Sequence, residues 1–532
     1  MLDRLAAGLA AAALRLPPAR TRRVTVTRDI ALRVRDGVIL RTDHYAPDLP
    51  AAPTVLIRTP YGRAGPMRLL CRLAAEQGFH VVIQSCRGTG GSGGEFQPFV
   101  HERDDGLDTL DWLRRQRWWT GAFGMFGASY QGFVQWALAA DAGPQLRAMV
   151  AVATASTTRD STYAGESFAL DTVLTWAELL QAQTVPWLAR QWELKRGQPR
   201  LAAALAHLPL IEADRVATGV TVPFFQEWLR HHTPQADYWR SRVFDDRLHL
   251  VGAPVAMVSG WHDIFLPAQL RDYTALRATG ARPRLVVGPW THGSPGLFVA
   301  ALREGLRWLD THLSDEGAGE AAHPADAAVR LHVGGALSPA DPVPSPPDGF
   351  WYDPADPTPS LGGPLLVAQR AGPFDNRPVE ARPDVLTWTS EPLTAAIEVV
   401  GPVRAEIHLR SELTYLDVFV RLCDVDARGR SWNVCDGLVR LDPQRFPADG
   451  TGAVVVPVEM WPTAHRFAPG HRLRLQVSGG AHPRYARNPG TGEPLGAAVT
   501  LRRGFREIMH DPDHPSAVVL PVVHSASQAS PS

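Results

Sequence analysis

The chain has 532 residues, of which 45% are hydrophobic, and its 54 basic side chains balance 54 acidic ones. This length is too great for one ordinary hydrophobic core, so two or three domains are expected. Because neither sign of charge is concentrated in a long run, the sequence shows no basic surface for nucleic acid or for an anionic membrane. We therefore expect a small-molecule substrate.

The N-terminal segment, MLDRLAAGLAAAALRLPPARTRR, resembles a secretory signal only in part, because Asp3 precedes a short apolar run and no small-x-small cleavage site follows. Leu2, Leu5, Leu9 and Leu16 fall near one helical face, which predicts a short amphipathic helix lying on the body. No stretch is long and apolar enough to predict a membrane span. A cytoplasmic location is the simpler expectation.

Residues 1–157 alternate between strand and helix patterns, which predicts a sheet that is at least partly parallel. The strand signal disappears over residues 158–248, where runs such as LDTVLTWAELLQAQ and VPFFQEWLRHH predict an inserted helical cap. Residues 249–325 resume the sheet pattern with PVAMVSGW and PRLVVGPW. The fold class predicted for this part is therefore α/β.

Residues 326–532 have a different character. A Pro- and Gly-rich span, which includes GAGEAAHPAD and SPADPVPSPPDG, predicts a linker and loops. Short alternating runs then dominate, among them LDVFVRLCDV, GAVVVPVEM and HRLRLQVSG. This spacing predicts a C-terminal β-sandwich of the jelly-roll type. The oligomeric state stays open, although such an extended β domain would suit a homodimer.

The four cysteines are too few to staple a chain of this length, and none stands in CxxC spacing. Cys423 and Cys435 flank a predicted hairpin turn at 426–430, which leaves a cross-strand disulfide between them open. The HExxH motif is absent and the histidines are scattered, so neither a metal nor a cofactor is expected.

Residues 127–132, with the sequence GASYQG, lie between an apolar run and a helix pattern, as a nucleophile elbow would. Gly127 supplies the small residue that the sharp turn needs two positions before Ser129. Two positions after the serine stands Gln131, followed by Gly132, so the GxSxG consensus is not strictly met. On these residues alone, a small-residue turn with a packed serine remains an alternative.

Two later segments supply partners in the order that α/β-hydrolases use, which is serine, then acid, then histidine. Asp263 follows the strand pattern PVAMVSGW, and His292 follows PRLVVGPW. His292 would take the proton from the Ser129 hydroxyl, and Asp263 would orient the imidazole. His262 is the competing base, but it adjoins the acid in sequence, which makes it difficult for one loop to present both groups.

A tetrahedral intermediate needs hydrogen-bond donors for its oxyanion. One predicted donor is the backbone N–H of Tyr130, the residue after the nucleophile. The other should come from a loop after an early strand, and RTPYG at residues 58–62 is such a loop. The Tyr61 hydroxyl could serve there, although a loop tyrosine more often only packs.

Seven segments occur in the order found in the cocaine esterase and X-prolyl dipeptidyl-peptidase-like family of acyl hydrolases, and together they resemble that family over nearly the whole chain. They are DGVILRTDHYAP, LIRTPYGR, VVIQSCRGTGGSGGEFQPF, DGLDTLDWLRRQRWWTGAFGMFGASYQG, GWHDIF, VGPWTHG and the span from DVLTWTSEPL to HRLRLQVSGGAHPRYARNPGTG. The family elbow, GxSYxG, accommodates the Gln131 departure.

This resemblance implies an α/β-hydrolase domain, an inserted helical cap and a C-terminal jelly roll. It also implies that Ser129, Asp263 and His292 form the catalytic triad. The Tyr61 hydroxyl and the Tyr130 N–H would then form the oxyanion hole. An aromatic residue that some members place at the acyl pocket corresponds to Phe265.

The substrate is left open among carboxylic esters, acyl amides such as β-lactam side chains, and dipeptides ahead of proline. An ester is preferred, because the extra N-terminal domain expected of the lactic-acid-bacterial X-Pro peptidases is absent. Aromatic residues of the cap weakly favour an apolar or aromatic acyl group, namely Trp176, Phe224, Phe225 and Trp228.

Two other functions were weighed. GTGGSG at residues 88–93 fits the GxGxxG dinucleotide motif, but EFQPF follows where an apolar helix should begin. An inactive scaffold whose β-sandwich binds a ligand such as a sugar is the second, and the fold alone would not exclude it. Against that function, no member of the triad is missing.

Overall fold

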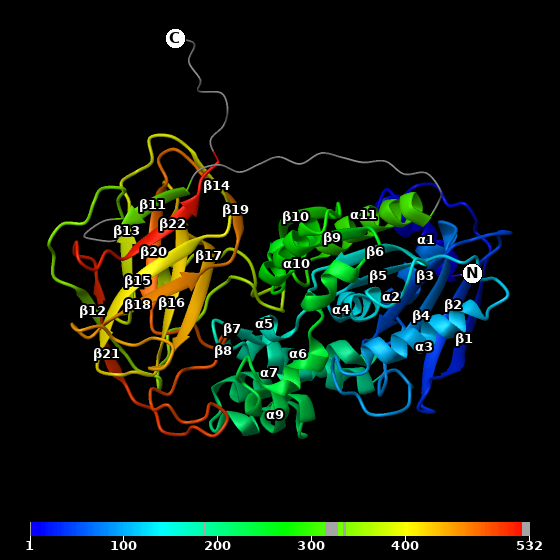
Figure 1. Ribbon diagram of the computed structural model, residues 1–532, viewed down its shortest axis with the longest axis horizontal. Coiled ribbons are helices and arrows are strands. Elements are labelled where there is room, and N and C mark those ends of the chain that lie inside the picture. The colour runs from blue at the N-terminus through cyan, green and yellow to red at the C-terminus, as the bar shows by residue number, and fades with distance from the viewer. Residues whose placement is uncertain (1, 186, 314–327, 333–336, 524–532) are drawn as a thin grey trace, which may run out of the picture. The chain divides into compact units, whose positions relative to one another are not determined.

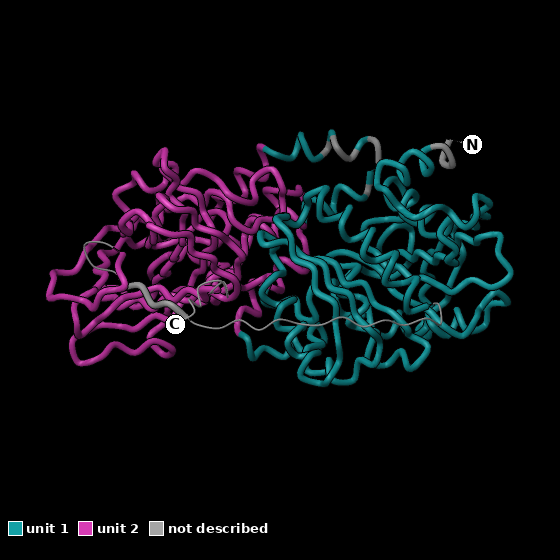
Figure 2. The backbone as a smooth tube through the Cα atoms, turned by 90° about the horizontal axis from the view of Figure 1, so that it is seen from above, with its two compact units in different colours: residues 1–160, 177–198, 234–320 teal, residues 161–176, 199–233, 321–532 magenta. Residues whose placement is uncertain are grey.

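The structure is a computed structural model that describes residues 2–185, 187–313, 328–332 and 337–523. The chain forms two compact units, which Figure 2 distinguishes by colour. Unit 1 comprises residues 1–160, 177–198 and 234–320, and unit 2 comprises residues 161–176, 199–233 and 321–532. The segment predicted as a cap is thus shared between the two units, and the four-part division made from the sequence stays a prediction.

Unit 1 is built on an eight-stranded sheet (Figure 1). In spatial order the strands are β1 (Val24–Arg33), β2 (Ile39–Pro47), β4 (His80–Ser85), β3 (Thr54–Thr59), β5 (Phe123–Ala128), β6 (Leu146–Val152), β9 (Val255–His262) and β10 (Arg284–Thr291). Strand β2 runs antiparallel to both of its neighbours, β1 and β4. The remaining neighbouring strands are parallel to one another.

Alternating residues of the central strands enter different cores, because successive side chains of a strand point to opposite faces. Val55 and Ile57 of β3 belong to one apolar cluster, whereas Leu56 belongs to the other. The first cluster also takes residues from α1 (Leu2–Ala13), α2 (Pro66–Glu76) and α11 (Pro295–Leu313), and the second takes them from α3 (Glu102–Arg114), α4 (Tyr130–Ala139) and α10 (Leu266–Ala278). Helices therefore cover both faces, as the predicted α/β class requires.

The N-terminal helix α1 packs on the body, as predicted, and Leu16 after it packs against the apolar cluster, but Leu9 does not. Leu9 is 75% exposed, whereas Ala7 is fully buried. Ala10, Ala11 and Leu14 pack against the same cluster as Ala7. The expectation that Leu9 belongs to the buried face was therefore wrong, because small alanine side chains let the helix lie close to the core.

The segment between β6 and β9 is mainly helical, as predicted from its sequence. Its two strands, β7 (Tyr163–Ala164) and β8 (Ser167–Phe168), have only two residues each. Short 3₁₀ turns connect its helices. The α-helices are α5 (Arg159–Thr162), α6 (Leu170–Gln181), α7 (Trp187–Ala206), α8 (Ala213–Thr218) and α9 (Pro223–Arg230).

The C-terminal part of unit 2 is a β-sandwich, in agreement with the predicted fold class. One sheet has the order β11-β22-β15-β21-β12 with β18 paired to β15, and a second has the order β13-β20-β16-β17. A two-stranded sheet, β14 with β19, stands beside them. Their bounds are β11 (Ala328–His332), β12 (Asp348–Tyr352), β13 (Val385–Thr389), β14 (Ile397–Gly401), β15 (Arg404–Ser411), β16 (Leu416–Val425), β17 (Ser431–Leu441), β18 (Ala453–Glu459), β19 (Thr463–Phe467), β20 (Arg472–Ser478), β21 (Gly504–Met509) and β22 (Ala517–Pro521), with a single helical turn, α12 (Arg377–Glu380), between β12 and β13.

The two larger sheets share one apolar core. Ile407 and Leu409 of β15 meet Val420 and Leu422 of β16 in it. The loop predicted over SPADPVPSPPDG leads into β12. The other predicted linker sequence, GAGEAAHPAD, lies outside the described residues.

All four cysteines are buried and free, so Cys423 and Cys435 do not pair. They lie on the adjacent strands β16 and β17, but Cys435 stands opposite Leu422 and Cys423 stands opposite Asn433. Burial raises the pKa of Cys423 to about 12. The thiols are therefore buried apolar groups in this part of the fold.

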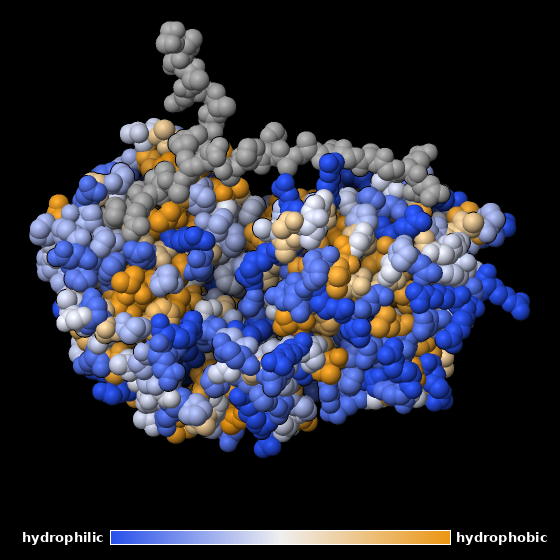
Figure 3. Space-filling model, in the orientation of Figure 1, coloured by the Kyte–Doolittle hydropathy of each residue, from blue (hydrophilic) through white to orange (hydrophobic). Residues whose placement is uncertain are grey.

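On the face drawn in Figure 3, hydrophobic patches alternate with hydrophilic residues. Exposed large apolar residues such as Trp192 and Val343 occur singly along the chain, which is normal for a globular protein. Among the described residues, no helix has the length and apolar character needed to cross a membrane.

A buried triad of charged residues, Arg421, Asp436 and Arg484, lies inside the β-sandwich and stabilises it. Asp436 accepts hydrogen bonds from Arg421 on one carboxylate oxygen and from Arg484 on the other. Arg421 also donates to Asn376 Oδ1 and to the Leu361 carbonyl oxygen, each at 2.6 Å. Burial acts to raise the pKa of Asp436, but the two guanidinium groups hold it below its usual value.

Replacing Asp436 by asparagine should destabilise unit 2, because two buried guanidinium groups would then lack a counter-charge. The expected loss in the free energy of unfolding is about 3–5 kcal/mol. Urea unfolding followed by tryptophan fluorescence would measure it. Glu459→Gln, in the exposed pair with Arg404, is the control and should change stability by less than about 1 kcal/mol. An equal effect of the two variants would contradict a structural role for the triad.

Candidate active site

The three predicted catalytic residues follow strands that end at the same edge of the sheet of unit 1. Ser129 follows β5, Asp263 follows β9 and His292 follows β10. Strand β6 lies between β5 and β9, and β10 lies next to β9. Because parallel strands carry their carboxyl ends to one edge, segments more than a hundred residues apart converge there.

Ser129 occupies a strained turn between β5 and α4. Its φ of 58° and ψ of −125° place a non-glycine residue where backbone sterics are unfavourable. Its N–H donates to the Val152 carbonyl oxygen of β6, and its carbonyl oxygen accepts from the N–H of Gly132. The neighbouring strand and the first turn of the helix therefore both hold the serine in this conformation.

The glycines on either side of the serine are required by close packing. A Cβ added at Gly127 would lie 2.4 Å from Gln131 Cβ, and one added at Gly132 would lie 2.3 Å from Thr154 Cγ2. The second small residue of the elbow is therefore Gly132, which faces the loop after β6. This contact explains in physical terms why position 131 can carry a long side chain.

Asp263 and His292 are joined by a short hydrogen bond. His292 Nδ1 lies 2.9 Å from Asp263 Oδ2, and the Asp263 side chain is fully buried. The other oxygen of Asp263 accepts from the N–H of Phe265 at 2.8 Å, which fixes the carboxylate. A carboxylate held in this way orients the imidazole and leaves Nε2 as the ring nitrogen that can accept a proton.

The loop that carries His292 is fixed by Trp290. An added Cβ at Gly288 would lie 2.7 Å from the indole ring of Trp290, and one at Gly296 would lie 2.8 Å from it. The two glycines thus leave the space that the indole fills. We infer that this packing determines where the chain turns before His292.

Phe265 lies beside the histidine, as the resemblance implied for an aromatic residue of the acyl pocket. The centroids of the Phe265 and His292 rings are 5.5 Å apart. Trp176 belongs to unit 2, where its ring stacks on Trp228 and also contacts Phe224. Its predicted role in the substrate pocket stays a prediction.

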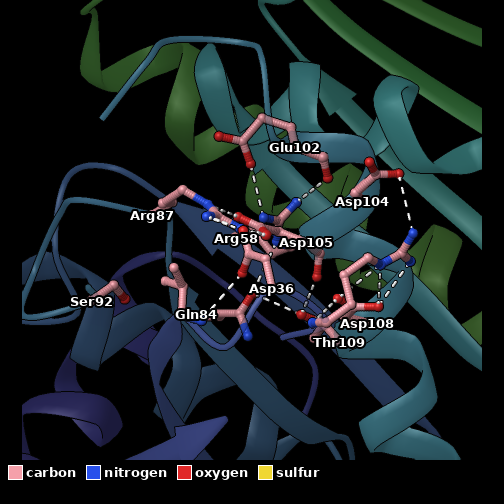
Figure 4. Close-up of polar contacts among 12 residues, drawn as sticks. Asp36, Arg58, Gln84, Arg87, Ser92, Glu102, Asp104, Asp105, Asp108 and Thr109 are labelled. Carbon is pink, nitrogen blue, oxygen red and sulfur yellow. Dashed lines mark hydrogen bonds and ion pairs between the residues drawn. The ribbon is translucent and has the colours of Figure 1, made fainter. Parts of the chain in front are cut away.

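Beneath the elbow, the side chain of Tyr130 enters a buried polar network, part of which is shown in Figure 4. The Tyr130 hydroxyl donates to Glu102 Oε1 at 2.7 Å and accepts from the Phe99 N–H at 2.9 Å. Glu102 Oε2 lies 2.9 Å from Arg58 Nη2, and Arg58 also donates to Gln84 Oε1. The phenol of Tyr130 therefore points into the core, and only its backbone N–H could serve an oxyanion.

The electrostatics of this network act on the pKa of Tyr130 and on that of Arg58. Burial, reinforced by the Glu102 carboxylate, raises the pKa of the Tyr130 hydroxyl well above its usual value. Burial alone would lower the pKa of Arg58, but Glu102 raises it above the usual value. The network is thus a neutral phenol hydrogen-bonded to a closed ion pair.

Tyr61 lies in the loop after β3, and β3 pairs with β5. Its backbone N–H donates to Thr59 Oγ1 at 3.1 Å. The predicted hydroxyl donor therefore comes from the strand next to the one that carries Ser129. Its role in an oxyanion hole stays a prediction at this point.

The glycine-rich segment at 88–93 is a tight loop rather than the start of a helix. A Cβ added at Gly88 would lie 2.2 Å from the Phe96 N atom, and one at Gly90 would lie 2.4 Å from Ser85 Oγ. These contacts account for the glycines without a bound phosphate. In the described part of the chain, no group of three or more His, Cys, Asp or Glu side chains could hold a metal ion.

Several residues that support the site belong to no recognisable sequence motif. Glu102 and Arg58 anchor Tyr130 from beneath, and Asp272 of α10 accepts hydrogen bonds from the N–H and hydroxyl of Ser156 at 2.7 and 2.6 Å. Burial raises the pKa of Asp272 to about 7. The sequence signal that could have found them is a charged residue on a predicted strand or helix at a position that faces inward.

Comparison with known proteins assigns the chain to a family. The family model for X-Pro dipeptidyl-peptidase (S15 family) matches residues 36–294, and that for the X-Pro dipeptidyl-peptidase C-terminal non-catalytic domain matches residues 309–519. Cocaine esterase from Rhodococcus sp. (strain MB1 Bresler) is 31% identical, over 94% of this chain and 99% of that protein. The chain belongs to the family of cocaine esterase and the S15 X-Pro dipeptidyl-peptidases. It is therefore a hydrolase of the S15 serine hydrolase family.

Solved structures agree on the fold. An aminopeptidase from a marine sediment archaeon, Thaumarchaeota archaeon, superposes with a TM-score of 0.79 at 21% identity, over 94% of this chain and 96% of that one. An α-amino acid ester hydrolase superposes with a TM-score of 0.77 at 23% identity, with the same coverage of each chain. The family resemblance predicted from the seven sequence segments is thus confirmed.

Changing Tyr130 to phenylalanine should separate the roles of its backbone and side chain. The variant loses the hydrogen bond to Glu102, which should cost about 1–3 kcal/mol of stability. It keeps the backbone N–H, so kcat should fall by much less than the roughly 10²–10³-fold expected when an oxyanion donor is lost. Thermal unfolding and ester hydrolysis would measure the two effects.

Tyr163→Phe is the matched control, since it removes another buried tyrosine hydroxyl, which donates to the Trp228 carbonyl oxygen at 2.8 Å in unit 2. A loss of kcat in Tyr130→Phe as large as that of a donor deletion would mean that the phenol itself takes part in the reaction.

Proposed function

We propose that the chain hydrolyses carboxylic esters through an acyl-enzyme formed on Ser129, with His292 as the base and Asp263 as the residue that orients it. The observation that supports this most directly is the buried hydrogen bond between His292 Nδ1 and Asp263 Oδ2, at the sheet edge where the strained elbow presents Ser129. Beyond the hydrogen bonds described above, the proposal requires one more contact, between Ser129 Oγ and His292 Nε2.

In the first half-reaction, Ser129 Oγ attacks the ester carbonyl carbon while His292 Nε2 takes the hydroxyl proton. The carbonyl oxygen becomes an oxyanion, which accepts hydrogen bonds from the Tyr130 N–H and the Tyr61 hydroxyl. The bond to the leaving oxygen then breaks, and His292 returns the proton to the alcohol. Asp263 stabilises the imidazolium during these steps without taking its proton.

In the second half-reaction, water replaces the alcohol. His292 removes a proton from the water, whose oxygen attacks the acyl carbon, and the Ser129 oxygen leaves with the proton from His292. The free acid is released and Ser129 is restored. The same two oxyanion donors serve both tetrahedral intermediates.

An ester substrate is preferred to an amide for two reasons. The relative that is 31% identical over nearly the whole chain is a cocaine esterase. Phe265 beside His292 provides an apolar surface for an acyl group. We assign no inhibitory or regulatory function to the C-terminal β-sandwich.

The nucleophile is tested by substituting Ser129 with alanine and by labelling with a fluorophosphonate. Ser129→Ala should lower kcat by roughly three or more orders of magnitude while the thermal unfolding temperature changes little. The wild-type enzyme should carry the label on Ser129, as mass spectrometry of the digested protein would show. Absence of any label would favour the inactive binding scaffold, and a label on another residue would show that Ser129 is not the nucleophile.

The substrate class is tested with p-nitrophenyl esters of graded chain length beside Ala-Pro-p-nitroanilide. We expect kcat/KM for the best ester to exceed that for the anilide by at least about two orders of magnitude, because the proposed site lacks an assigned group for the substrate amine. Phe265→Ala should reduce kcat/KM more for a benzoate ester than for an acetate. Faster cleavage of the anilide would reassign the enzyme to the X-Pro peptidases.

A further inference from the structure

The loop that carries Tyr61 is tied to the elbow through one buried hydroxyl. Thr59 Oγ1, at the end of β3, accepts a hydrogen bond from the Tyr61 N–H at 3.1 Å and another from Gln131 Nε2 at 3.0 Å. Thr59 is fully buried and Gln131 is 7% exposed. The bond between Gln131 and Thr59 is therefore shielded from water, which would otherwise compete for the same groups, and the bond from Tyr61 is partly shielded.

The other end of the Gln131 amide faces the elbow itself. Its Oε1 accepts from the Ala128 N–H at 3.4 Å, and its Cβ packs against Gly127, where an added Cβ would lie 2.4 Å away. Gln131 thus contacts the residues just before the nucleophile and, through Thr59, the loop with Tyr61. It also occupies the position at which this elbow departs from GxSxG.

The far side of the same loop is anchored by Arg63. Its guanidinium group donates to Asp43 Oδ1 at 3.0 Å and to the Gly90 carbonyl oxygen at 2.9 Å, and it also contacts Ser85 Oγ and Asp29. The glycine-rich loop thus supplies one of the acceptors that hold Arg63. The Tyr61 loop is thus held on one side by Arg63 and is connected to the elbow through Thr59 and Gln131.

We propose that Gln131 is a positioning residue that sets the distance between the Tyr61 hydroxyl and the Ser129 oxyanion site. This inference rests on the proposed function, because it assumes that Tyr61 is an oxyanion donor. An oxyanion hole works only when its donors lie within about 2.7–3.1 Å of the developing charge. A side chain that spans the elbow and the donor loop keeps the two together when the substrate binds.

The test begins with Gln131→Met, which keeps the length of the side chain but removes the hydrogen bonds that its amide makes with Thr59 Oγ1, the Ala128 N–H and Met67 Sδ. We expect kcat to fall about tenfold while KM stays unchanged, because the contact matters only in the transition state. The inhibition constant of an alkylboronic acid, which forms a tetrahedral adduct with the serine, should rise by a similar factor.

Gln135→Met is the matched control. Gln135 lies one turn further along α4, is equally buried, and donates through Nε2 to the carbonyl oxygens of Gln131 and Val150, without contact to the Tyr61 loop. This variant should lose stability but keep kcat and the affinity for the boronic acid. Equal losses of kcat in both glutamine variants would overturn the inference, since any buried amide would then matter.

A second pair of variants keeps the test decisive if Gln131→Met does not fold. Thr59→Val removes the shared acceptor while nearly preserving the volume, and Thr59→Ser retains the hydroxyl. We expect Thr59→Val to reproduce the loss of kcat and Thr59→Ser to restore most of it. A serine variant as slow as the valine variant would overturn the inference, because the hydroxyl would not be the link.

The double variant with Tyr61→Phe separates this inference from the proposed function. Tyr61→Phe alone should lower kcat by about 10²–10³-fold, and adding Gln131→Met should cause little further loss, because the group it positions is already gone. If the losses of kcat in the two single variants instead multiply in the double variant, the inference is wrong and the enzyme assignment is unaffected. An unchanged kcat in Tyr61→Phe would overturn the inference too, whereas absence of the fluorophosphonate label on Ser129 would refute the proposed function itself.

Discussion

The whole site depends on the backbone conformation of one residue, Ser129. A φ of 58° in a non-glycine residue carries a cost of about 1–3 kcal/mol, which the surrounding structure must offset. Hydrogen bonds from the Ser129 N–H to the Val152 carbonyl oxygen and from the Gly132 N–H to the Ser129 carbonyl oxygen hold the turn, and the absence of side chains at Gly127 and Gly132 gives it room. The serine hydroxyl is thereby presented at the edge of a rigid sheet.

The parallel sheet and a buried ion pair stabilise the surroundings of the turn and so offset the cost of that strain. Strands β3, β5, β6, β9 and β10 deliver their carboxyl ends to one edge, so the loops with Tyr61, Asp263 and His292 need only be short. Beneath them, Arg58 and Glu102 form a pair that would be costly to break, because either charge alone would be desolvated without compensation. The Tyr130 side chain is bonded to this pair, which limits how far the first turn of α4 can shift.

Much of the architecture, and the position of Ser129, Asp263 and His292 after strands of the sheet, could be predicted from the sequence, because strand and helix periodicity and glycine spacing are local properties. The predicted Leu9 face of α1 was wrong, since the pattern of leucines did not show that the closest approach would be made by Ala7. The hydrogen bond from Gln131 to Thr59 could not be predicted from the sequence either. It joins residues 72 positions apart through side chains whose directions only the folded chain defines.

The departure of the elbow from GxSxG can be understood from the same contacts. The second glycine is needed where the helix meets the chain after β6, and in this protein that residue is Gly132, against Thr154. Position 131 is then released from the requirement for a small residue and points toward β3, the strand that leads to Tyr61. A glutamine at this position can hydrogen-bond to both neighbours at once, whereas a glycine could bond to neither through a side chain. The altered motif therefore retains the strained serine. It also adds a hydrogen-bonded connection, through Gln131 and Thr59, between the elbow and the proposed oxyanion donor Tyr61.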